Sequence, residues 1–424
     1  MSVFIIALVV MSLLLLAQSA YSTVLMLYSW NDVGRKEEYG APAAFIPPQK
    51  SFTVMLPARH EEDVIQHTIE GMLAANYPRN LLEIVVICRI DDKGTIAKVQ
   101  EKIVELVNRG IDNVQLIVFQ DNPINKPHGL NVALPFTKND VVTIFDAEDH
   151  IHPDVFNIVN TVMVNDGVNV VQSGVQLMNY DSKWFSALNV LEYFFWFKSR
   201  LHFHSRAGVI PLGGNTIFFA RSVLNKIGGW DETCLTEDAE IGIRLSMMGE
   251  RIRVVYDDAY VTKEETPPTV GQFVKQRTRW NQGFIQVLRR GLYWQLPLFK
   301  QRMLALYTLS SPVFQTITAL YLPISIYTFF FVKVAPLLAM ILWLPMYMLI
   351  GQYVLNVVGL YEFTAAHNLK LSKFAWLKLL VAFYPFQVLL GVSAVRAMWR
   401  EMQGTNTWEK TRHVNAHRTA LGGS

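Results

Sequence analysis

Acidic residues gather at three places where an apolar, β-branched run of the chain stops. Phe52 to Leu56 is followed by Arg59 to Asp63, a second run ends at Asp91 and Asp92, and a later one ends at Asp146 to Asp149. Carboxylates that meet at one edge repel one another unless a cation or hydrogen-bond donors neutralise them. Those in the third cluster offer the hard oxygen ligands that Mg²⁺ and Mn²⁺ prefer. A single loop acid is ordinarily solvated, but three clusters together predict a cation site.

A fourth acidic pair opens the segment TEDAEIGIRL, which has helical spacing. Thr236 occupies the N-cap position, and Glu237 and Asp238 fall in the first turn. Acids in a first turn ordinarily serve as capping and dipole residues, and this is the simplest interpretation of Glu237.

The segment QRTRWNQG places three polar or aromatic side chains on one helix face. Gln276, Arg279 and Trp280 are spaced i, i+3 and i+4, and residues at that spacing are neighbours on a helix surface. Arg277 falls off that face, so we expect it to be solvated. A positioned guanidinium can stabilise negative charge that develops on a departing group.

An α/β domain must position these residues. Apolar, β-branched runs alternate with amphipathic helical stretches such as Asp63 to Ala75 and Lys93 to Asn108, which predicts a mostly parallel sheet with helices on both faces. Ligands of such sheets bind at the carboxyl ends of the strands, where the acids lie. The expected strands are Phe52 to Leu56, Ile84 to Ile90, Val114 to Phe119, Val141 to Phe145 and Val168 to Gln172.

Apolar segments on either side of this domain indicate a membrane protein. Val3 to Leu27 is long enough to span a bilayer and lacks the basic start of a signal peptide. Basic residues begin after it, at Arg35, which places the following domain in the cytoplasm. Three more apolar blocks follow Arg302, and they run from Met303 to Val332, Val334 to Tyr361 and Leu379 to Trp399.

The third block has basic residues on both flanks, including Lys378 and Arg400, and it contains Pro385. Since a single crossing cannot begin and end on one side, we interpret the block as re-entrant or interfacial, with a plain third crossing as the alternative. Phe284 to Arg302 mixes apolar and basic residues, as an in-plane surface helix would. The predicted division is an N-terminal transmembrane helix at 1–30, a catalytic domain at 45–283, an interfacial helix at 284–302, a transmembrane region at 303–399 and a cytosolic tail at 400–424.

Composition agrees with this division. The 424 residues are 51% hydrophobic and 17% charged, with a net charge of +3, so nucleic acid is not an expected partner. Cys88 and Cys234 belong to no metal-ligand pattern, and we expect reduced thiols.

The chain resembles the membrane-embedded family 2 glycosyltransferases, the inverting enzymes that include cellulose, chitin and hyaluronan synthases. The resemblance covers most of the chain, and its ordered motifs here are PARHEE, IDD, KPHGLN, DAED, PLGGN, GGWDE, TED and QRTRW. Two motifs depart from the family pattern, because CRIDDKGT replaces the commoner DDGS and DAED replaces a plain D-x-D. The resemblance implies a GT-A (Rossmann-like) cytosolic domain between N- and C-terminal transmembrane helices.

Carried over residue by residue, the resemblance implies a nucleotide-sugar site. Ala58, Glu61, Asp91 and Asp92 would line the base and ribose, with Lys126 nearby. Asp146 would hold Mg²⁺ or Mn²⁺ on the diphosphate together with Glu148 or Asp149, and which of the two pairs with it stays open.

The same resemblance implies the catalytic and acceptor residues. Asp238 would be the general base, next to Glu237, and Gln276, Arg279 and Trp280 would serve the leaving diphosphate and the acceptor sugar. We assign Gly214 and Asn215 to the acceptor wall. The tail residues Trp408, Thr411 and Arg412 would close over the bound nucleotide.

The predicted function is transfer of a hexosyl unit from a nucleotide diphosphate sugar, expected to be a UDP-sugar, to a growing polysaccharide, with processive synthesis and coupled export. The expected location is the bacterial cytoplasmic membrane. With few spans available, a homo-oligomer or an accessory partner would complete the export path. The alternatives are single addition to a lipid-linked acceptor, and a catalytically idle regulator that binds nucleotide sugars.

Overall fold

The computed structural model describes residues 3–30, 36–333 and 335–409. Its α/β domain is built on a mixed seven-stranded sheet, and all five predicted runs form strands whose bounds differ from the expected ones by at most two residues. In spatial order the strands are β3 (Val114–Phe119), β2 (Leu82–Arg89), β1 (Phe52–Pro57), β4 (Val141–Ile144), β7 (Ile217–Ala220), β5 (Val170–Ser173) and β8 (Ile252–Val255).

Strand β7 was not predicted, and it is the one that makes the sheet mixed. It pairs antiparallel with both β4 and β5, with Ile144 opposite Ile217, whereas the other neighbours in the sheet are parallel. A two-stranded parallel sheet of β6 (Val175–Leu177) and β9 (Thr262–Glu264) lies beyond β5 and β8 in the chain. Because β7 enters from the PLGGN segment, it brings Gly214 and Asn215 to the end of β4, where Asp146 follows.

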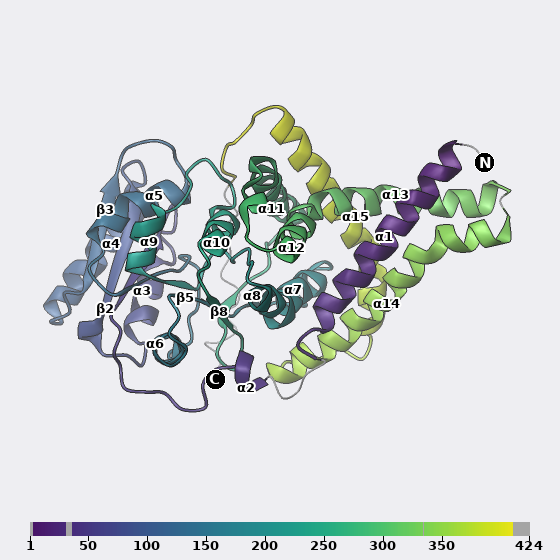
Figure 1. Ribbon diagram of the computed structural model, residues 1–424. Coiled ribbons are helices and arrows are strands. Elements are labelled where there is room, and N and C mark those ends of the chain that lie inside the picture. Colours follow the sequence, from purple (N-terminus) through teal and green to yellow (C-terminus); the bar gives the residue numbers. More distant parts are fainter. Residues whose placement is uncertain (1–2, 31–35, 334, 410–424) are drawn as a thin grey trace.

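Helices cover both faces of the sheet (Figure 1), and residues of each strand alternate between two hydrophobic cores. Val54 and Phe218 face the core formed with α3, α4 and α6, while Met55 and Phe219 face the core that includes α5, α7, α10 and α11. The helix bounds are α2 (Lys36–Tyr39), α3 (Ile65–Leu73), α4 (Lys93–Asn108), α5 (Lys126–Ala133), α6 (Val155–Asp166), α7 (Ser186–Phe195), α8 (Leu201–Ala207), α9 (Arg221–Ile227), α10 (Glu237–Met247), α11 (Val270–Arg290) and α12 (Phe299–Leu309).

Four helices are long and apolar enough to cross a membrane, namely α1 (Val3–Leu27), α13 (Ser311–Phe331), α14 (Pro336–Ala366) and α15 (Ala375–Met402). In Figure 1, α1, α13 and α14 project away from the sheet domain. Their outer faces expose large apolar side chains, among them Leu14 at 52%, Phe331 at 73% and Leu337 at 71%. Such faces are unfavourable in water and suit a hydrocarbon environment.

Helix α15 differs from the expected re-entrant element. It continues without interruption through Pro385, so the expected break is not found. It lies along α11, where the rings of Phe386 and Phe273 are 5.4 Å apart and Arg400 Nε donates to Gln282 Oε1 at 3.0 Å. Its length also permits a crossing, so an interfacial position for this segment stays a prediction.

The predicted interfacial helix over Phe284 to Arg302 is wrong as a single element. Helix α11 ends at Arg290, and its C-cap Gly291 has the left-handed φ of 68° that glycine tolerates best. A short 3₁₀ turn follows before α12 begins. The amphipathic pattern of this stretch arises because two separate helices pack on the domain, and Gln301 Nε2 of α12 donates to the carbonyls of Ala207 and Gly208.

Candidate active site

A cavity of about 590 Å³ lies at the carboxyl ends of β1 and β4 and continues toward α1, α13 and α14. Most of the predicted site residues line it. They are Ala58, Glu61, Lys126, Asp146, Glu148, Gly214, Asn215, Glu237, Asp238, Gln276, Arg279, Trp280 and Trp408.

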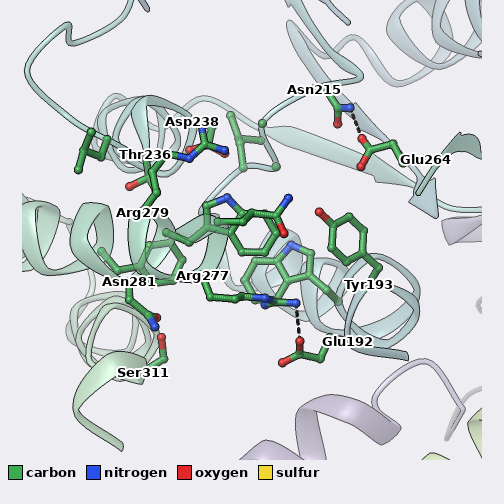
Figure 2. Close-up of a pocket in the computed structure, with 18 of the residues that line it drawn as sticks. Glu192, Tyr193, Asn215, Thr236, Asp238, Glu264, Arg277, Arg279, Asn281 and Ser311 are labelled. Carbon is green, nitrogen blue, oxygen red and sulfur yellow. Dashed lines mark hydrogen bonds and ion pairs between the residues drawn. The ribbon is translucent and has the colours of Figure 1, made fainter. Parts of the chain in front are cut away.

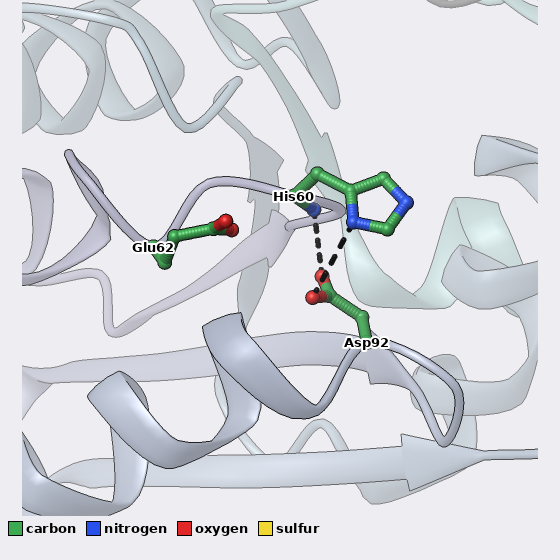
Figure 3. Close-up of side chains that lie close together, drawn as sticks. All are labelled: His60, Glu62 and Asp92. Carbon is green, nitrogen blue, oxygen red and sulfur yellow. Dashed lines mark hydrogen bonds and ion pairs between the residues drawn. The ribbon is translucent and has the colours of Figure 1, made fainter.

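Asp91 and Asp92 lie outside the lining of this cavity. Asp92 is the N-cap of α4, and its carboxylate accepts from the backbone N–H groups of Thr95 at 3.2 Å and His60 at 2.6 Å. Burial alone would raise the pKa of Asp92, but these hydrogen bonds lower it. Figure 3 shows Asp92 beside His60 and Glu62, and Asp91 forms ion pairs with Arg59 and Arg89. In this structure both acids therefore shape the loops around the cavity.

The acids of the DAED motif differ in whether they face the cavity or are buried. Asp146 and Glu148 line the cavity, whereas Asp149 is 3% exposed and accepts from the Asp146 N–H at 2.8 Å and from the Asn215 amide at 2.9 Å. Burial, with the neighbouring Glu264, Asp146 and Glu148, raises the pKa of Asp149. The pair that faces the cavity is therefore Asp146 with Glu148.

Lys126 is the cation at this end of the cavity. Its Nζ donates to Asp146 Oδ1 at 2.5 Å and to the Gly214 carbonyl at 2.9 Å. Burial opposes its charge, yet Asp146, Glu237 and Asp149 raise the pKa of Lys126. It therefore stays protonated among the acids.

Asn215 lines the cavity beside two acids, and its predicted place in the acceptor wall stays a prediction. Its amide donates to Asp149 and also to Glu264 of β9, as Figure 2 shows for the second partner. The next residue, Thr216, has a φ of 52°, which is strained for a β-branched residue. The hydrogen bonds of Asn215 in this turn thus hold the carboxylates of Asp149 and Glu264 near the donor end of the cavity. Gly214 approaches Asp238, because a Cβ on it would lie 3.3 Å from Asp238 Oδ2.

Glu237 and Asp238 begin α10 and both reach the cavity. Thr236 occupies the N-cap position, although no side-chain cap bond from it is found within the described residues. Burial, followed by repulsion from Asp238, raises the pKa of Glu237 to about 7, and burial also raises the pKa of Asp238. Carboxylates with raised pKa values near neutrality are suited to accept a proton.

Gln276, Arg279 and Trp280, which the sequence places on one face of α11, all line the cavity. Arg279 Cζ lies 4.3 Å from the centre of the Trp408 ring, a cation–π distance. Figure 2 shows Arg279 extending toward Asp238 of α10. Among the described residues, the buried Arg279 Nε and Gln276 Oε1 have no hydrogen-bond partner, so both are open to a ligand.

Arg277 is not solvated, contrary to the expectation from helix spacing. Its side chain is 11% exposed, pairs with Glu192 of α7 at 2.5 Å and lies with Cζ 4.6 Å from the centre of the Trp280 ring. Side chains of α11 contact α7 through the Arg277–Glu192 pair and the rings of Trp280 and Tyr193, and α11 also packs on α10 and α15. More than one face of α11 is therefore covered. Sequence reasoning missed Glu192, although a charged residue within the aromatic run LEYFFWFKSR was a signal for it.

The tail is held over α11. Gln282 Nε2 donates to the Thr405 carbonyl at 2.8 Å, and Arg396 binds Glu409 through two hydrogen bonds of 2.8 and 2.7 Å. These contacts bring Trp408 to the cavity and to Arg279. Thr411 and Arg412, which were predicted to act with it, lie outside the described residues.

Comparison with known proteins places this geometry in a family. Residues 47–283 match the family model described as "Glycosyltransferase like family 2". A probable glycosyltransferase, YdaM, of Bacillus subtilis is 26% identical over 260 residues, which cover 59% of both chains. A beta-monoglucosyldiacylglycerol synthase of Nostoc sp. is 26% identical over 59% of this chain and 52% of that protein. A poly-beta-1,6-N-acetyl-D-glucosamine synthase of Staphylococcus epidermidis is 26% identical over 64% of this chain and 63% of that protein.

The chain thus spans less than two thirds of the length of these relatives. A solved structure, the mannosyltransferase PcManGT of Pyrobaculum calidifontis in complex with GDP-Man and Mn²⁺, matches 93% of this chain and 99% of its own with a TM-score of 0.53 and 20% identity. That likeness confirms the GT-A fold. Because the family model covers more than half of the sequence, the chain belongs to the family 2 glycosyltransferases and is an enzyme of that family.

Proposed function

We propose that the enzyme transfers a hexosyl unit, with inversion at the anomeric carbon, from a nucleotide diphosphate sugar to an acceptor hydroxyl that reaches the cavity from its bilayer side. The observation that carries the proposal is the cavity itself. A base, a leaving-group cation and an aromatic platform converge at its donor end, and its other end continues between apolar helices.

In the proposed reaction the acceptor oxygen attacks the anomeric carbon, the bond from that carbon to the diphosphate breaks, and the hydroxyl proton passes to Asp238. Burial keeps the pKa of Asp238 above its ordinary value, although Lys126 and Arg279 lower it, and a raised pKa favours proton acceptance. Arg279, whose Nε is free within the described residues, would stabilise the negative charge on the departing diphosphate. The Trp280 indole, held by Arg277, would stack against the acceptor sugar.

The residues at the donor end fit a divalent cation. Asp146 and Glu148 are hard oxygen ligands that face the cavity, beside a lysine that already neutralises part of their charge. A bound Mg²⁺ or Mn²⁺ would neutralise the diphosphate. The mannosyltransferase PcManGT, which shares the fold, was solved with Mn²⁺. The donor is expected to be a UDP-sugar, and Ala58 and Glu61 are the lining residues that would meet the nucleotide.

The growing end of a polysaccharide is the first candidate acceptor. Toward the bilayer the cavity lining includes many uncharged hydrogen-bonding side chains, which suit a hydroxyl-rich chain that leaves through the helices. They are Gln18, Ser19, Gln315, Thr318, Gln352, Asn356 and Gln387. A single addition to a lipid-linked acceptor is the second candidate. It is favoured by the apolar outer faces of the same helices, from which a lipid could enter.

The test uses the full chain in membranes of a bacterial host, with the sheet domain in the cytoplasm. Incubation with a panel of radiolabelled nucleotide sugars and Mg²⁺ or Mn²⁺, followed by sizing of the product, separates polymer, single addition and no reaction. Asp112→Asn, at an exposed acid outside the cavity, is the control for Asp238→Asn. Absence of transfer from every donor would refute the proposal.

A further inference from the structure

A second arginine lines the cavity at its bilayer end. Arg200 is the last residue of a π-helical turn, Trp196–Arg200, between α7 and α8. Its Nη2 donates to Ser22 Oγ of α1 at 2.8 Å. Next to it, Ser199 Oγ donates to the Leu25 carbonyl at 2.8 Å and accepts from the Ser29 N–H at 3.0 Å. Short π-helical turns are frequent at functional sites, and this one fastens Arg200 to the end of α1.

The charge of Arg200 is not neutralised by the protein. Among the described residues no carboxylate lies within 4.0 Å of its guanidinium, and its buried Nε has no partner there either. Glu192 is the carboxylate that acts on Arg200 electrostatically, and it already pairs with Arg277 at 2.5 Å. Two guanidinium groups therefore share one carboxylate, which leaves an excess positive charge at this end of the cavity. Burial lowers the pKa of Arg200, as expected of a cation without a counterion.

The other groups around Arg200 are neutral donors or acceptors. Ser22 and Gln18 of α1 line the cavity together with Tyr307 of α12 and Asn356 of α14. The Tyr307 hydroxyl lies 3.4 Å from the Gln18 carbonyl, to which it donates. The donor end, in contrast, is lined by six acids, which are Glu61, Asp146, Glu148, Glu237, Asp238 and Glu264. The cavity is therefore acidic where the nucleotide sugar would bind and basic where it enters the helices.

The position of Arg200 relative to the bilayer indicates the source of an anion that it would bind. Helix α1 has 25 residues, so it is about 37 Å long, somewhat more than the hydrocarbon core of about 30 Å. Ser22 is five residues before the last residue of α1, within about 8 Å of that end. If α1 spans the bilayer, Ser22 and its partner Arg200 lie close to the boundary between the hydrocarbon core and the lipid head groups, which a long arginine side chain can reach.

We propose that Arg200 binds the phosphate of a membrane-borne acceptor, with Ser22 and Tyr307 as further donors, while the acceptor hydroxyl extends toward Asp238. This inference rests on the proposed function and narrows its second candidate acceptor to a phosphate-bearing lipid. A guanidinium with free N–H groups is the side chain best suited to phosphate oxygens. A neutral acceptor such as a diacylglycerol would leave the charge of Arg200 unmatched.

The test compares two acceptors in detergent micelles with the full chain. One is phosphatidylglycerol, whose head group has a phosphate and free hydroxyls, and the other is a diacylglycerol. We expect kcat/KM to favour the phosphate-bearing lipid. Arg200→Gln should reduce that preference by roughly tenfold or more, mainly through KM, because it removes a charged hydrogen bond. Arg200→Lys should retain part of the preference. The exposed Arg206, six residues further along and outside the cavity lining, provides the control Arg206→Gln.

A wild-type enzyme without preference for the phosphate-bearing lipid, or an Arg200→Gln enzyme that keeps the preference, would overturn the inference. Should Arg200→Gln not fold, Ser22→Ala and Tyr307→Phe serve instead, each with an expected loss of a few-fold. Thermal protection by phosphatidic acid micelles adds a readout that does not need catalysis. Equal protection by inorganic phosphate would make the site one for soluble anions. Protection by the lipid without any sugar transfer would refute the proposed function but not this site.

Discussion

Gly283→Ala is expected to slow catalysis although residue 283 does not line the cavity. Gly283 lies where α11 crosses the start of α10, and it is buried. A Cβ at this position would lie 2.3 Å from Thr236 Oγ1, 2.5 Å from its Cγ2 and 2.7 Å from its Cβ. Thr236 directly precedes the acids Glu237 and Asp238, so a displacement of Thr236 moves the proposed base.

The size of the displacement follows from these contacts. Ordinary contact begins at 3.4 Å, so Thr236 and α11 must separate by about 1 Å. Overpacking of this kind costs about 1–3 kcal/mol of stability. A misplacement of about 1 Å at reacting groups can reduce the rate by about 10²-fold. We therefore expect a large loss of kcat and a lower melting temperature, with a much smaller change in donor affinity, because Lys126 and Asp146 are on other elements.

The matched control is Gly271→Ala at the other end of the same helix. A Cβ there would lie 3.9 Å from Thr269 Oγ1, and alanine in place of glycine favours a helix by about 1 kcal/mol. The measurements are kcat with saturating donor, the donor dissociation constant by calorimetry, and thermal unfolding. A Gly283→Ala enzyme with kcat within threefold of the wild type would refute the reasoning, as would equal losses in the two variants.

Further predictions concern single side chains. Asp238→Asn should lower kcat by about 10²–10⁴ with nearly unchanged nucleotide affinity, and turnover near the wild-type rate would remove Asp238 from the mechanism. Asp146→Ala should weaken nucleotide-diphosphate binding in the presence of Mn²⁺, and EDTA should stop turnover; indifference to EDTA would contradict the metal assignment. Trp408→Ala should raise the donor KM several-fold, because it removes a cation–π contact worth about 0.5–2 kcal/mol. Met402→Ala, at an exposed residue, is its control. An unchanged donor saturation curve in Trp408→Ala would contradict a role for the tail. Burial and Asp238 raise the pKa of Glu237 from 4.5 to about 7. The folded chain therefore keeps a proton that the unfolded chain releases, and the free energy of unfolding falls as pH rises from about 4.5 to about 7. Glu237→Gln should raise the melting temperature at about pH 8 and change it little at about pH 4, and equal shifts at both pH values would contradict this.

The local pattern of apolar residues was sufficient to predict the bounds of regular strands and helices. Strand β3 and helix α4 have the predicted bounds, because an alternation of apolar residues and a strong amphipathic period depend only on the neighbouring sequence. Strand β7 has four residues and pairs antiparallel between strands that are distant in the chain. Its short apolar run is equally compatible with a loop or a helix, so only tertiary pairing determines it.

For the candidate site, the motifs predicted which residues meet but not how each is used. Lys126, Asp146 and Asp238 are far apart in the chain, and all three line the cavity. The division of labour between Glu148 and Asp149 depends on which way each side chain leaves the turn after β4, and spacing does not contain that information. Arg200 was missed because its significance comes from the absence of a nearby carboxylate among the described residues, which only the packed structure reveals.

The way the tail is fastened determines how often the cavity mouth is open. Among the described residues its ties are a few hydrogen bonds, the cation–π contact of Trp408 with Arg279, and the pair of Arg396 with Glu409, whose side chains are 33% and 22% exposed. Such partly exposed pairs contribute about 0.2–1 kcal/mol each, so the attachment that the described residues make amounts to about 2–3 kcal/mol. An attachment of that size leaves roughly one per cent of molecules open at any moment. Segments of this kind move in microseconds to milliseconds, whereas enzymes typically turn over about ten times per second. The tail would therefore open and close many times in each catalytic cycle, and exchange of nucleotide past Trp408 would not limit the rate.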